Sequence, residues 1–234
     1  MTKIAVNGAS GRMGTRILAL AAGQGCEAAG SFDDKGTRLS AEALKKAGKG
    51  VLIDFSSPAG TLEAIDAASQ AGWGLVVGTT GLEAKQTDAL KKISQTIPVV
   101  FSYNMSVGVN LVAEVLEFLS KKLPVDFGLE ITEAHHIHKK DAPSGTAIML
   151  LNSIAGSKGW DAARTQKEKE RIKAIREGEI VGDHSVLFTG PAETIEIRHH
   201  AVSRDIFANG ALVAAKFAFS AKPGFYNMRD VLKK

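Results

Sequence analysis

The 234-residue sequence contains a single cysteine, Cys26, so it cannot form an internal disulfide, and a reducing compartment suits it. No apolar run approaches the roughly 20 residues that span a bilayer, and the first residues read as a strand instead of a signal segment. The net charge is only +4, and no basic helix or aromatic-basic stripe indicates nucleic-acid binding. We therefore expect a cytoplasmic protein that binds neither a membrane nor a nucleic acid, and whose small positive excess serves anionic small ligands.

A strand, a glycine turn and a helix follow one another at the amino terminus. Lys3 to Val6 is a short apolar segment, the turn reads Gly8-Ala9-Ser10-Gly11-Arg12-Met13-Gly14, and a helical pattern continues from Thr15 to Ala22. Such glycines permit a tight turn and let backbone amides approach a pyrophosphate. Asp33 ends the next strand, Glu27 to Phe32, where a carboxylate can accept hydrogen bonds from ribose hydroxyls. A lone glycine could be only a turn, but the four features in register predict dinucleotide binding.

Further apolar strands with helices between them predict a doubly wound sheet. They run from Val51 to Phe55, from Leu75 to Val77 and from Val99 to Ser102. The ligand of an open α/β sheet lies at the carboxyl ends of its strands. The residues there are candidates for holding the ribose and nicotinamide, although each could equally serve loop or capping chemistry: Gly78, Thr79, Thr80, Ser102, Tyr103, Asn104 and Met105.

The periodicity changes after residue 106, where a long amphipathic helix leads into further strands, expected at 126–132, 185–188 and 194–198. The charged run from Thr165 to Glu179 is expected to be a solvated helix or a mobile excursion without chemistry. The predicted fold class is α/β. A Rossmann-type nucleotide-binding domain spans 1–106, with 205–234 returning to it, and a smaller α+β substrate and oligomerisation domain spans 107–204.

Proton-transfer chemistry is most concentrated between Glu133 and Ala147. This stretch holds three imidazoles, His135, His136 and His138, beside Lys139, and it is expected to connect a strand ending at residue 132 to a helix from residue 148. Ser144 can cap that helix, which places the backbone amides of Gly145 and Thr146 at the positive end of its dipole, a ready anion site.

Two other interpretations of this stretch remain open. Three histidines in four positions suggest a metal site, but adjacent imidazoles point in different directions, no His-Glu-x-x-His helix is present, and Cys26 is distant in sequence. Alternatively, these side chains are ordinary polar loop residues satisfied by water and backbone. We expect no metal and favour a site of proton transfer.

The segments around these residues resemble the 4-hydroxy-tetrahydrodipicolinate reductase family over nearly the whole chain. The most specific segment reads His-His-x-His-Lys-x-Asp-Ala-Pro-Ser-Gly-Thr-Ala and is joined by Gly-Arg-Met-Gly, Gly-Thr-Thr-Gly, Gly-Asp-His and Phe-Ala-Asn-Gly-Ala. The resemblance implies NADH- or NADPH-dependent reduction of 4-hydroxy-tetrahydrodipicolinate, a small dicarboxylate, to tetrahydrodipicolinate in diaminopimelate and lysine biosynthesis. It also implies a homotetramer whose second domains form a shared sheet.

The same resemblance implies roles for individual residues. His135 would be a proton donor or acceptor and Lys139 the proton donor, while His136, Gly145 and Thr146 would bind the substrate. The cofactor would be contacted by Gly8, Ala9, Ser10, Gly11, Arg12, Met13, Asp33, Gly78, Thr79, Thr80, Ser102, Tyr103, Asn104 and Met105.

The chain departs from the family pattern in two places. Its connection before Gly-Asp-His is shorter than usual, and Asp34 and Lys35 follow Asp33 where a basic residue would favour NADPH, so the cofactor preference stays open. Alternative functions are another nicotinamide-dependent dehydrogenase or a non-catalytic cofactor-sensing protein. An aspartate-semialdehyde type would need a catalytic cysteine, and the only cysteine lies near the second strand.

Overall fold

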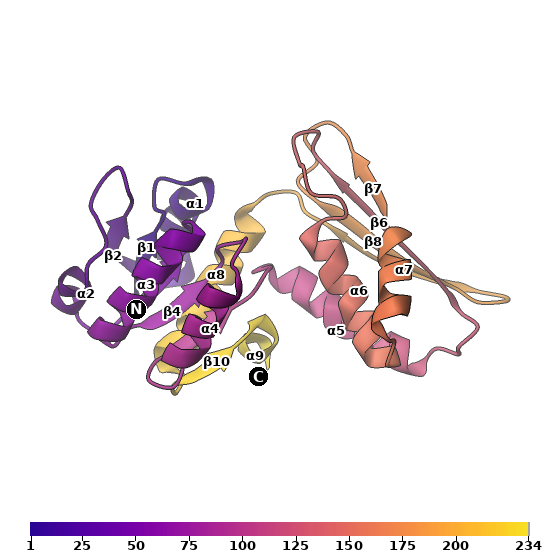
Figure 1. Ribbon diagram of the computed structural model, residues 1–234. Helices are drawn as coiled ribbons and strands as arrows, with labels where there is room; N and C mark the ends of the chain where they lie inside the picture. The colour runs from indigo at the N-terminus through magenta and orange to yellow at the C-terminus, as the bar shows by residue number, and fades with distance from the viewer. Residues whose placement is uncertain (234) are drawn as a thin grey trace. The chain divides into compact units, whose positions relative to one another are not determined.

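The computed structural model describes residues 1–233, which divide into two compact units. Unit 1 consists of Met1–Val107 together with the chain from Asp205 onward, and unit 2 consists of Gly108–Arg204. Each unit has its own sheet (Figure 1). No helix within residues 1–233 is long and apolar enough to cross a membrane.

Unit 1 is built on a parallel sheet of six strands in the order β10-β5-β4-β3-β1-β2. Strand β1 lies between β2 and β3, so the chain leaves β1 for one side of the sheet and later returns to the other. This arrangement creates the topological switch point at which Rossmann-type sheets bind their ligands. The strands are β1 (Thr2–Asn7), β2 (Cys26–Phe32), β3 (Val51–Asp54), β4 (Gly74–Val77), β5 (Pro98–Phe101) and β10 (Gly224–Tyr226).

Helices cover both faces of this sheet, because its strands carry apolar side chains on both sides. On one face, Ile4 and Ile53 pack with α1 (Arg12–Ala21), α8 (Asp205–Ser220) and α9 (Met228–Leu232). On the other face, Leu52 and Leu75 pack with α2 (Ala41–Ala47), α3 (Pro58–Ala71) and α4 (Ala84–Ile93). A short 3-10 helix, Ala22–Gln24, follows α1. The predicted Rossmann-type α/β class is confirmed.

Unit 2 is a four-stranded mixed sheet in the order β7-β6-β8-β9. Its strands are β6 (Gly128–His135), β7 (Lys173–Arg176), β8 (Asp183–Thr189) and β9 (Thr194–His200); β6 and β7 are parallel and the other pairs antiparallel. Its helices are α5 (Val107–Lys122), α6 (Gly145–Lys158) and α7 (Ala162–Glu170).

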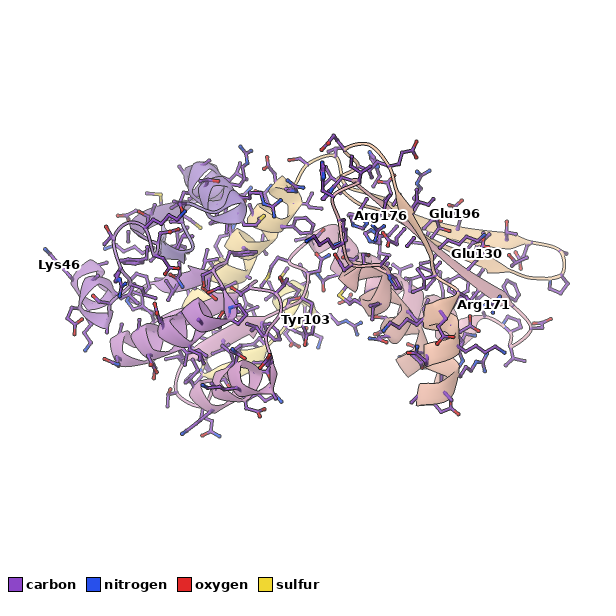
Figure 2. The ribbon with its side chains drawn as sticks, turned by 45° about the horizontal axis from the view of Figure 1, so that its top comes forward. Lys46, Tyr103, Glu130, Arg171, Arg176 and Glu196 are labelled. Carbon is purple, nitrogen blue, oxygen red and sulfur yellow. The ribbon has the colours of Figure 1, made fainter. Side chains whose placement is uncertain are left out.

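Only one face of the unit 2 sheet is well covered. Ile131 and Val186 on this face pack with Leu116 of α5 and Leu151 of α6. The buried face also carries polar groups, including Glu133, His135 and His184, which gather toward one end of β6 and β8. The opposite face is more exposed and carries charged side chains such as Glu196 (Figure 2).

Two expectations about unit 2 were wrong. Strand β6 extends to His135, so this histidine belongs to the sheet instead of the following connection. The charged run contains not only α7 but also strand β7, whose Lys173–Arg176 pair in parallel with Thr132–His135. The charge pattern gave no strand signal, because an edge strand with a solvated face can carry charged residues. Backbone pairing with β6 overrides local propensity there.

We expect that Gly14→Ala destabilises unit 1. A Cβ at Gly14 would lie 2.2 Å from the carbonyl oxygen of Gly8 and 2.7 Å from Ala9 Cα, so α1 would have to move away from the turn after β1. Overpacking of this kind costs about 1–3 kcal/mol. Urea unfolding of Gly14→Ala should show this loss. Gly23→Ala is the control, since a Cβ there meets nothing within 4 Å, and equal stability of the two variants would contradict the steric argument.

Candidate functional site

A hollow of about 230 Å³ lies at the switch point of unit 1. It is formed by the turn after β1, the end of β2 and the segment after β3. Of the predicted cofactor residues, it brings together Gly8, Ser10, Gly11 and Asp33. The lining residues are Asn7, Gly8, Ser10, Gly11, Asp33, Asp34, Phe55, Ser56, Ser57 and Gly60.

Glycine is required at the closest approaches around this hollow. Gly8 has φ +79°, and a Cβ there would lie 2.4 Å from the Phe55 carbonyl oxygen. A Cβ at Gly78 would lie 2.2 Å from the Phe55 ring. No side chain caps α1 at Gly11, so its first-turn amides suit a pyrophosphate at the positive end of the helix. The residues present therefore fit a dinucleotide.

Asp33 stands at the edge of the hollow with its carboxylate oriented by Ser10. The Ser10 hydroxyl donates to Asp33 Oδ2 at 2.6 Å and the Ser10 amide donates at 3.0 Å. These two hydrogen bonds lower the pKa of the half-buried Asp33 carboxyl. An ionised carboxylate in this place can accept hydrogen bonds from ribose hydroxyls.

Asp54 is a residue of this region to which the sequence gave no role. Its side chain is fully buried at the end of β3. Its oxygens accept hydrogen bonds from Asn7 Nδ2 at 2.8 Å, Ser56 Oγ at 2.5 Å, Thr61 Oγ1 at 2.6 Å and Thr79 Oγ1 at 2.8 Å. One carboxylate thus joins the ends of β1, β3 and β4 to the start of α3. An aspartate directly after an apolar strand was the signal available in the sequence.

The cofactor residues predicted at 78–80 and 102–105 lie outside the lining of this hollow. The Thr79 hydroxyl is committed to Asp54, and the Met105 side chain is 2% exposed within the core of unit 1. Asn104 is also buried, and its Oδ1 accepts the Ser106 amide. Tyr103 is 67% exposed (Figure 2). Any cofactor contact by Thr79, Asn104 or Met105 therefore falls mainly to the backbone.

In unit 2 the predicted catalytic residue His135 contacts a buried carboxylate, that of Glu133 on β6. Its Oε2 lies 2.5 Å from His135 Nδ1 and 3.0 Å from an Arg176 guanidinium nitrogen. Its Oε1 accepts the other guanidinium nitrogen at 2.8 Å and the Ser144 amide at 3.1 Å. Burial by itself would raise the pKa of the Glu133 carboxyl, but hydrogen bonds from Arg176 and His135 lower it below its usual value.

Arg176 is a second residue to which the sequence gave no role. Besides Glu133, its guanidinium donates to the carbonyl oxygens of Lys139 at 3.2 Å and Asp141 at 2.5 Å. It therefore holds the backbone of the segment that carries the predicted proton donor. Arg176 lies in the charged run to which no chemistry was assigned, and only the pairing of β7 with β6 places it beside Glu133.

His135 is 8% exposed, and burial lowers the pKa of its imidazole despite the neighbouring Glu133 carboxylate. This lowered pKa favours the neutral imidazole at pH 7. With Nδ1 in contact with a carboxylate, the proton of the neutral ring belongs on Nδ1 and Nε2 carries the lone pair. Its ring meets the His184 ring edge-on, with centroids 5.2 Å apart.

Ser144 connects this cluster to the start of α6, and its predicted role as the helix cap is confirmed. Its Oγ accepts the Ala147 amide at 3.2 Å and also bonds His184 Nε2 at 3.2 Å. His184 is 5% exposed, and burial lowers its pKa to about 4.

The remaining predicted residues lie in the segment from β6 to α6. Lys139 Nζ forms an ion pair with Asp141 Oδ2 at 2.9 Å. Burial opposes ionisation of Asp141, but Lys139 and backbone amides, including that of Gly145, lower its pKa. Gly145 and Thr146 form the first turn of α6, and the His136 amide donates to the Ile180 carbonyl oxygen.

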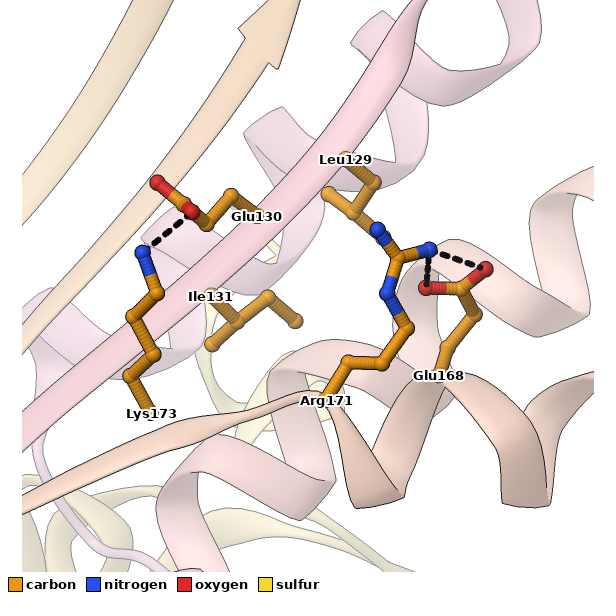
Figure 3. A pocket seen from close by; sticks show the side chains of 6 residues that line it. All are labelled: Leu129, Glu130, Ile131, Glu168, Arg171 and Lys173. Atoms are coloured by element: carbon orange, nitrogen blue, oxygen red, sulfur yellow. Dashed lines mark hydrogen bonds and ion pairs between the residues drawn. The ribbon is translucent and has the colours of Figure 1, made fainter.

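Another hollow, of about 240 Å³, lies in unit 2, and none of the predicted catalytic or binding residues lines it (Figure 3). Its charged groups pair with one another: Lys173 with Glu130, and Arg171 with Glu168 (Figure 3).

The single cysteine, Cys26, is a buried thiol whose pKa is raised by burial, which does not suit a nucleophile. Within residues 1–233, no group of three or more His, Cys, Asp and Glu is arranged to hold a metal ion.

We expect His184 to make the protein less stable on mild acidification. Its pKa of about 4 lies below the usual 6.5, so the unfolded chain binds the extra proton between these values. The free energy of unfolding is therefore up to about 3 kcal/mol larger above pH 6.5 than at pH 4, and this difference is lost progressively as the pH falls. Urea unfolding of His184→Gln should show a shallower loss in this range than the wild type. The exposed His138→Gln is the control, and equal slopes for all three proteins would contradict the assignment.

The sequence matches known families over both units. Residues 2–105 match the family described as "Dihydrodipicolinate reductase, N-terminus", and residues 108–232 match "Dihydrodipicolinate reductase, C-terminus". The 4-hydroxy-tetrahydrodipicolinate reductases of Burkholderia pseudomallei (strain 668) and Burkholderia mallei (strain SAVP1) are each 43% identical to the chain over 261 residues. These alignments cover 98% of this chain and 98% and 97% of the relatives. The aligned length exceeds the 234 residues of this chain, so the relatives carry insertions relative to it.

Solved structures share the fold. A dipicolinate-bound dihydrodipicolinate reductase from Paenisporosarcina sp. TG-14 has a TM-score of 0.84 at 20% identity, over 99% of this chain and 100% of that one. A diaminopimelate dehydrogenase from C. glutamicum has a TM-score of 0.60 at 13% identity, over 99% and 95% of the two chains. At these sequence identities the structural similarity shows the fold only. The sequence matches over both units show the family: the chain belongs to the dihydrodipicolinate reductase family.

Proposed function

We propose that the chain reduces 4-hydroxy-tetrahydrodipicolinate to tetrahydrodipicolinate with NADH or NADPH, a step of diaminopimelate and lysine biosynthesis. The observation that carries the proposal is in unit 2. His135, held by a buried carboxylate, ends β6, and the connection that follows it carries the Lys139 ammonium group and leads to the amides that begin α6. Membership of the reductase family and the curated relatives' names support the reaction.

Unit 1 would hold the cofactor. The turn from Gly8 to Met13 and the α1 amides would take the pyrophosphate, and Asp33 would take the ribose hydroxyls. The contacts predicted for 78–80 and 102–105 remain part of this proposal. When bound, the reduced nicotinamide supplies the hydride. The chain itself binds the dinucleotide and orients it.

Unit 2 would hold the substrate and manage the proton. Lys139 would be the principal proton donor, with His135 assisting, while His136, Gly145 and Thr146 would bind the dicarboxylate. Asp141 supports this arrangement, because its own carboxylate already engages the Lys139 ammonium group and the Gly145 amide. A substrate carboxylate can take over these two contacts, since the chemical group is the same.

The family resemblance further implies a homotetramer in the cytoplasm. We place the subunit contact on the less covered face of the unit 2 sheet. That face carries the exposed Ile175 and also charged groups that pair across strands, such as Arg198 with Asp183. Sedimentation of the purified chain would test this assembly.

We expect that Lys139→Ala lowers turnover by about 10² or more, because a positioned general acid contributes about 10² to 10⁴ in rate. NADH affinity and thermal stability should stay close to the wild type. The measurement is the loss of NADH absorbance with freshly generated 4-hydroxy-tetrahydrodipicolinate. Lys140→Ala is the matched control, since Lys140 is exposed on the same loop. Near-normal turnover of Lys139→Ala at saturating substrate would refute the assignment.

We also expect NADH to be used at least as well as NADPH. The ionised Asp33 favours free ribose hydroxyls, and Asp34, which lines the same hollow, repels a 2'-phosphate. Asp34→Asn should therefore raise the kcat/KM for NADPH more than that for NADH. A wild-type preference for NADPH of more than tenfold, about 1.4 kcal/mol of discrimination, would rule this expectation out.

A further inference from the structure

Four donor groups from three parts of unit 2 converge on the two oxygens of Glu133. They are His135 Nδ1 of the same strand, two guanidinium nitrogens of Arg176 on β7, and the Ser144 amide before α6, at distances from 2.5 to 3.1 Å. The Glu133 side chain has no exposed surface, whereas the Arg176 side chain is 19% exposed. Both oxygens therefore have hydrogen-bond partners without water.

Stability alone does not explain this arrangement. Removing a carboxylate from water costs several kcal/mol, and a well-packed apolar pair of similar size is often as stable as a buried ion pair or more so. What the charged pair provides is geometry. Arg–carboxylate pairs that are bidentate fix orientation as well as charge, and a carboxylate on one imidazole nitrogen fixes the tautomer of the ring.

Arg176 acts on both predicted catalytic groups through different contacts. Through Glu133 it keeps the carboxylate ionised and bidentate, which orients the His135 ring. Through the carbonyl oxygens of Lys139 and Asp141 it fixes the backbone that carries the Lys139 ammonium group. Figure 2 marks Arg176 and also Arg171, which lies at the end of α7 and pairs with Glu168.

The geometry points to Glu133 and Arg176 as positioning residues for the reaction: Glu133 holds His135 as the Nδ1-protonated tautomer with a bare Nε2, and Arg176 locks both Glu133 and the Lys139 backbone. Neither residue needs to touch the substrate or the cofactor. The inference rests on the proposed reductase function for its kinetic consequence, but the tautomer of His135 is a property of the chain by itself.

Several other groups bear on the charge of His135. Lys139 and Arg176 oppose its protonation and Glu133 favours it, while the neighbouring His184 is itself kept neutral by burial. Burial is the largest of these effects, and it lowers the pKa of His135, which favours the neutral ring at pH 7. A change at Glu133 or Arg176 should therefore alter the tautomer and the pH dependence together.

The first test uses the wild-type chain without substrate. One variant is needed, only to identify the His135 signals. Long-range proton–nitrogen spectra of the full chain labelled with 15N-histidine distinguish the two neutral tautomers and the imidazolium ion, and the His135 signals are identified by their loss in His135→Gln. At pH 7 we expect a protonated Nδ1 and a bare Nε2. An Nε2-protonated ring or an imidazolium ion would overturn the proposal.

The second test uses two variants with matched controls. Glu133→Gln removes the charge, and Arg176→Lys keeps the charge but cannot form the same bidentate pair and backbone contacts. Each should lower kcat at least about tenfold and change the pH profile of kcat/KM, with KM for NADH within about twofold; loss of a tautomer-fixing carboxylate can cost up to about 10⁴. Glu130→Gln and Arg171→Lys, in exposed ion pairs, should behave as the wild type.

The outcomes separate the two proposals. If Glu133→Gln does not fold, Arg176→Lys and the wild-type spectra decide the positioning roles. Variants that lose stability but keep the tautomer, kcat and the pH profile would show a structural role only and overturn the inference. A wild-type chain that shows the expected tautomer but never oxidises NADH with the substrate would overturn the proposed function and leave the positioning of His135 intact.

Discussion

The burial of one negative charge, that of Glu133, is the constraint on which the organisation of unit 2 depends. An isolated carboxylate inside a protein would cost several kcal/mol, so its position at the end of β6 requires donors on every side. Those donors come from β7, from the end of β6 itself and from the start of α6. Satisfying the charge therefore fixes the parts of the chain that carry the predicted catalytic groups.

Unit 1 also has a buried carboxylate that accepts several hydrogen bonds, next to its predicted cofactor site. Asp54 is buried at the end of β3 and accepts hydrogen bonds from four neighbouring side chains. The loops at the carboxyl edge of a parallel sheet have few apolar contacts of their own, and a shared carboxylate gives them a fixed geometry. In both units, a buried carboxylate, that of Asp54 or Glu133, fixes the backbone and side chains around the predicted site. The groups predicted to contact the ligand do not have to supply this support.

The two units also divide the predicted chemistry between them. Unit 1 offers a glycine turn, helix amides and Asp33, which suit a dinucleotide and do not transfer protons. Unit 2 offers a neutral imidazole, an ammonium group and a capped helix start, which suit an anionic substrate that must gain a proton. Each set lies within one compact unit and is held by that unit's own hydrogen bonds.

The sequence alone determined the Rossmann-type half, the helix cap at Ser144 and the likeness to the reductase family, because glycine spacing, strand alternation and capping depend on residues near one another in the chain. It could not determine the roles of Arg176 or Asp54. Arg176 lies 43 residues from Glu133, inside a charged run whose local pattern indicates solvent, and only the pairing of β7 with β6 brings the two together. The value of such a residue depends on a buried partner, and burial is decided by tertiary packing and not by local sequence.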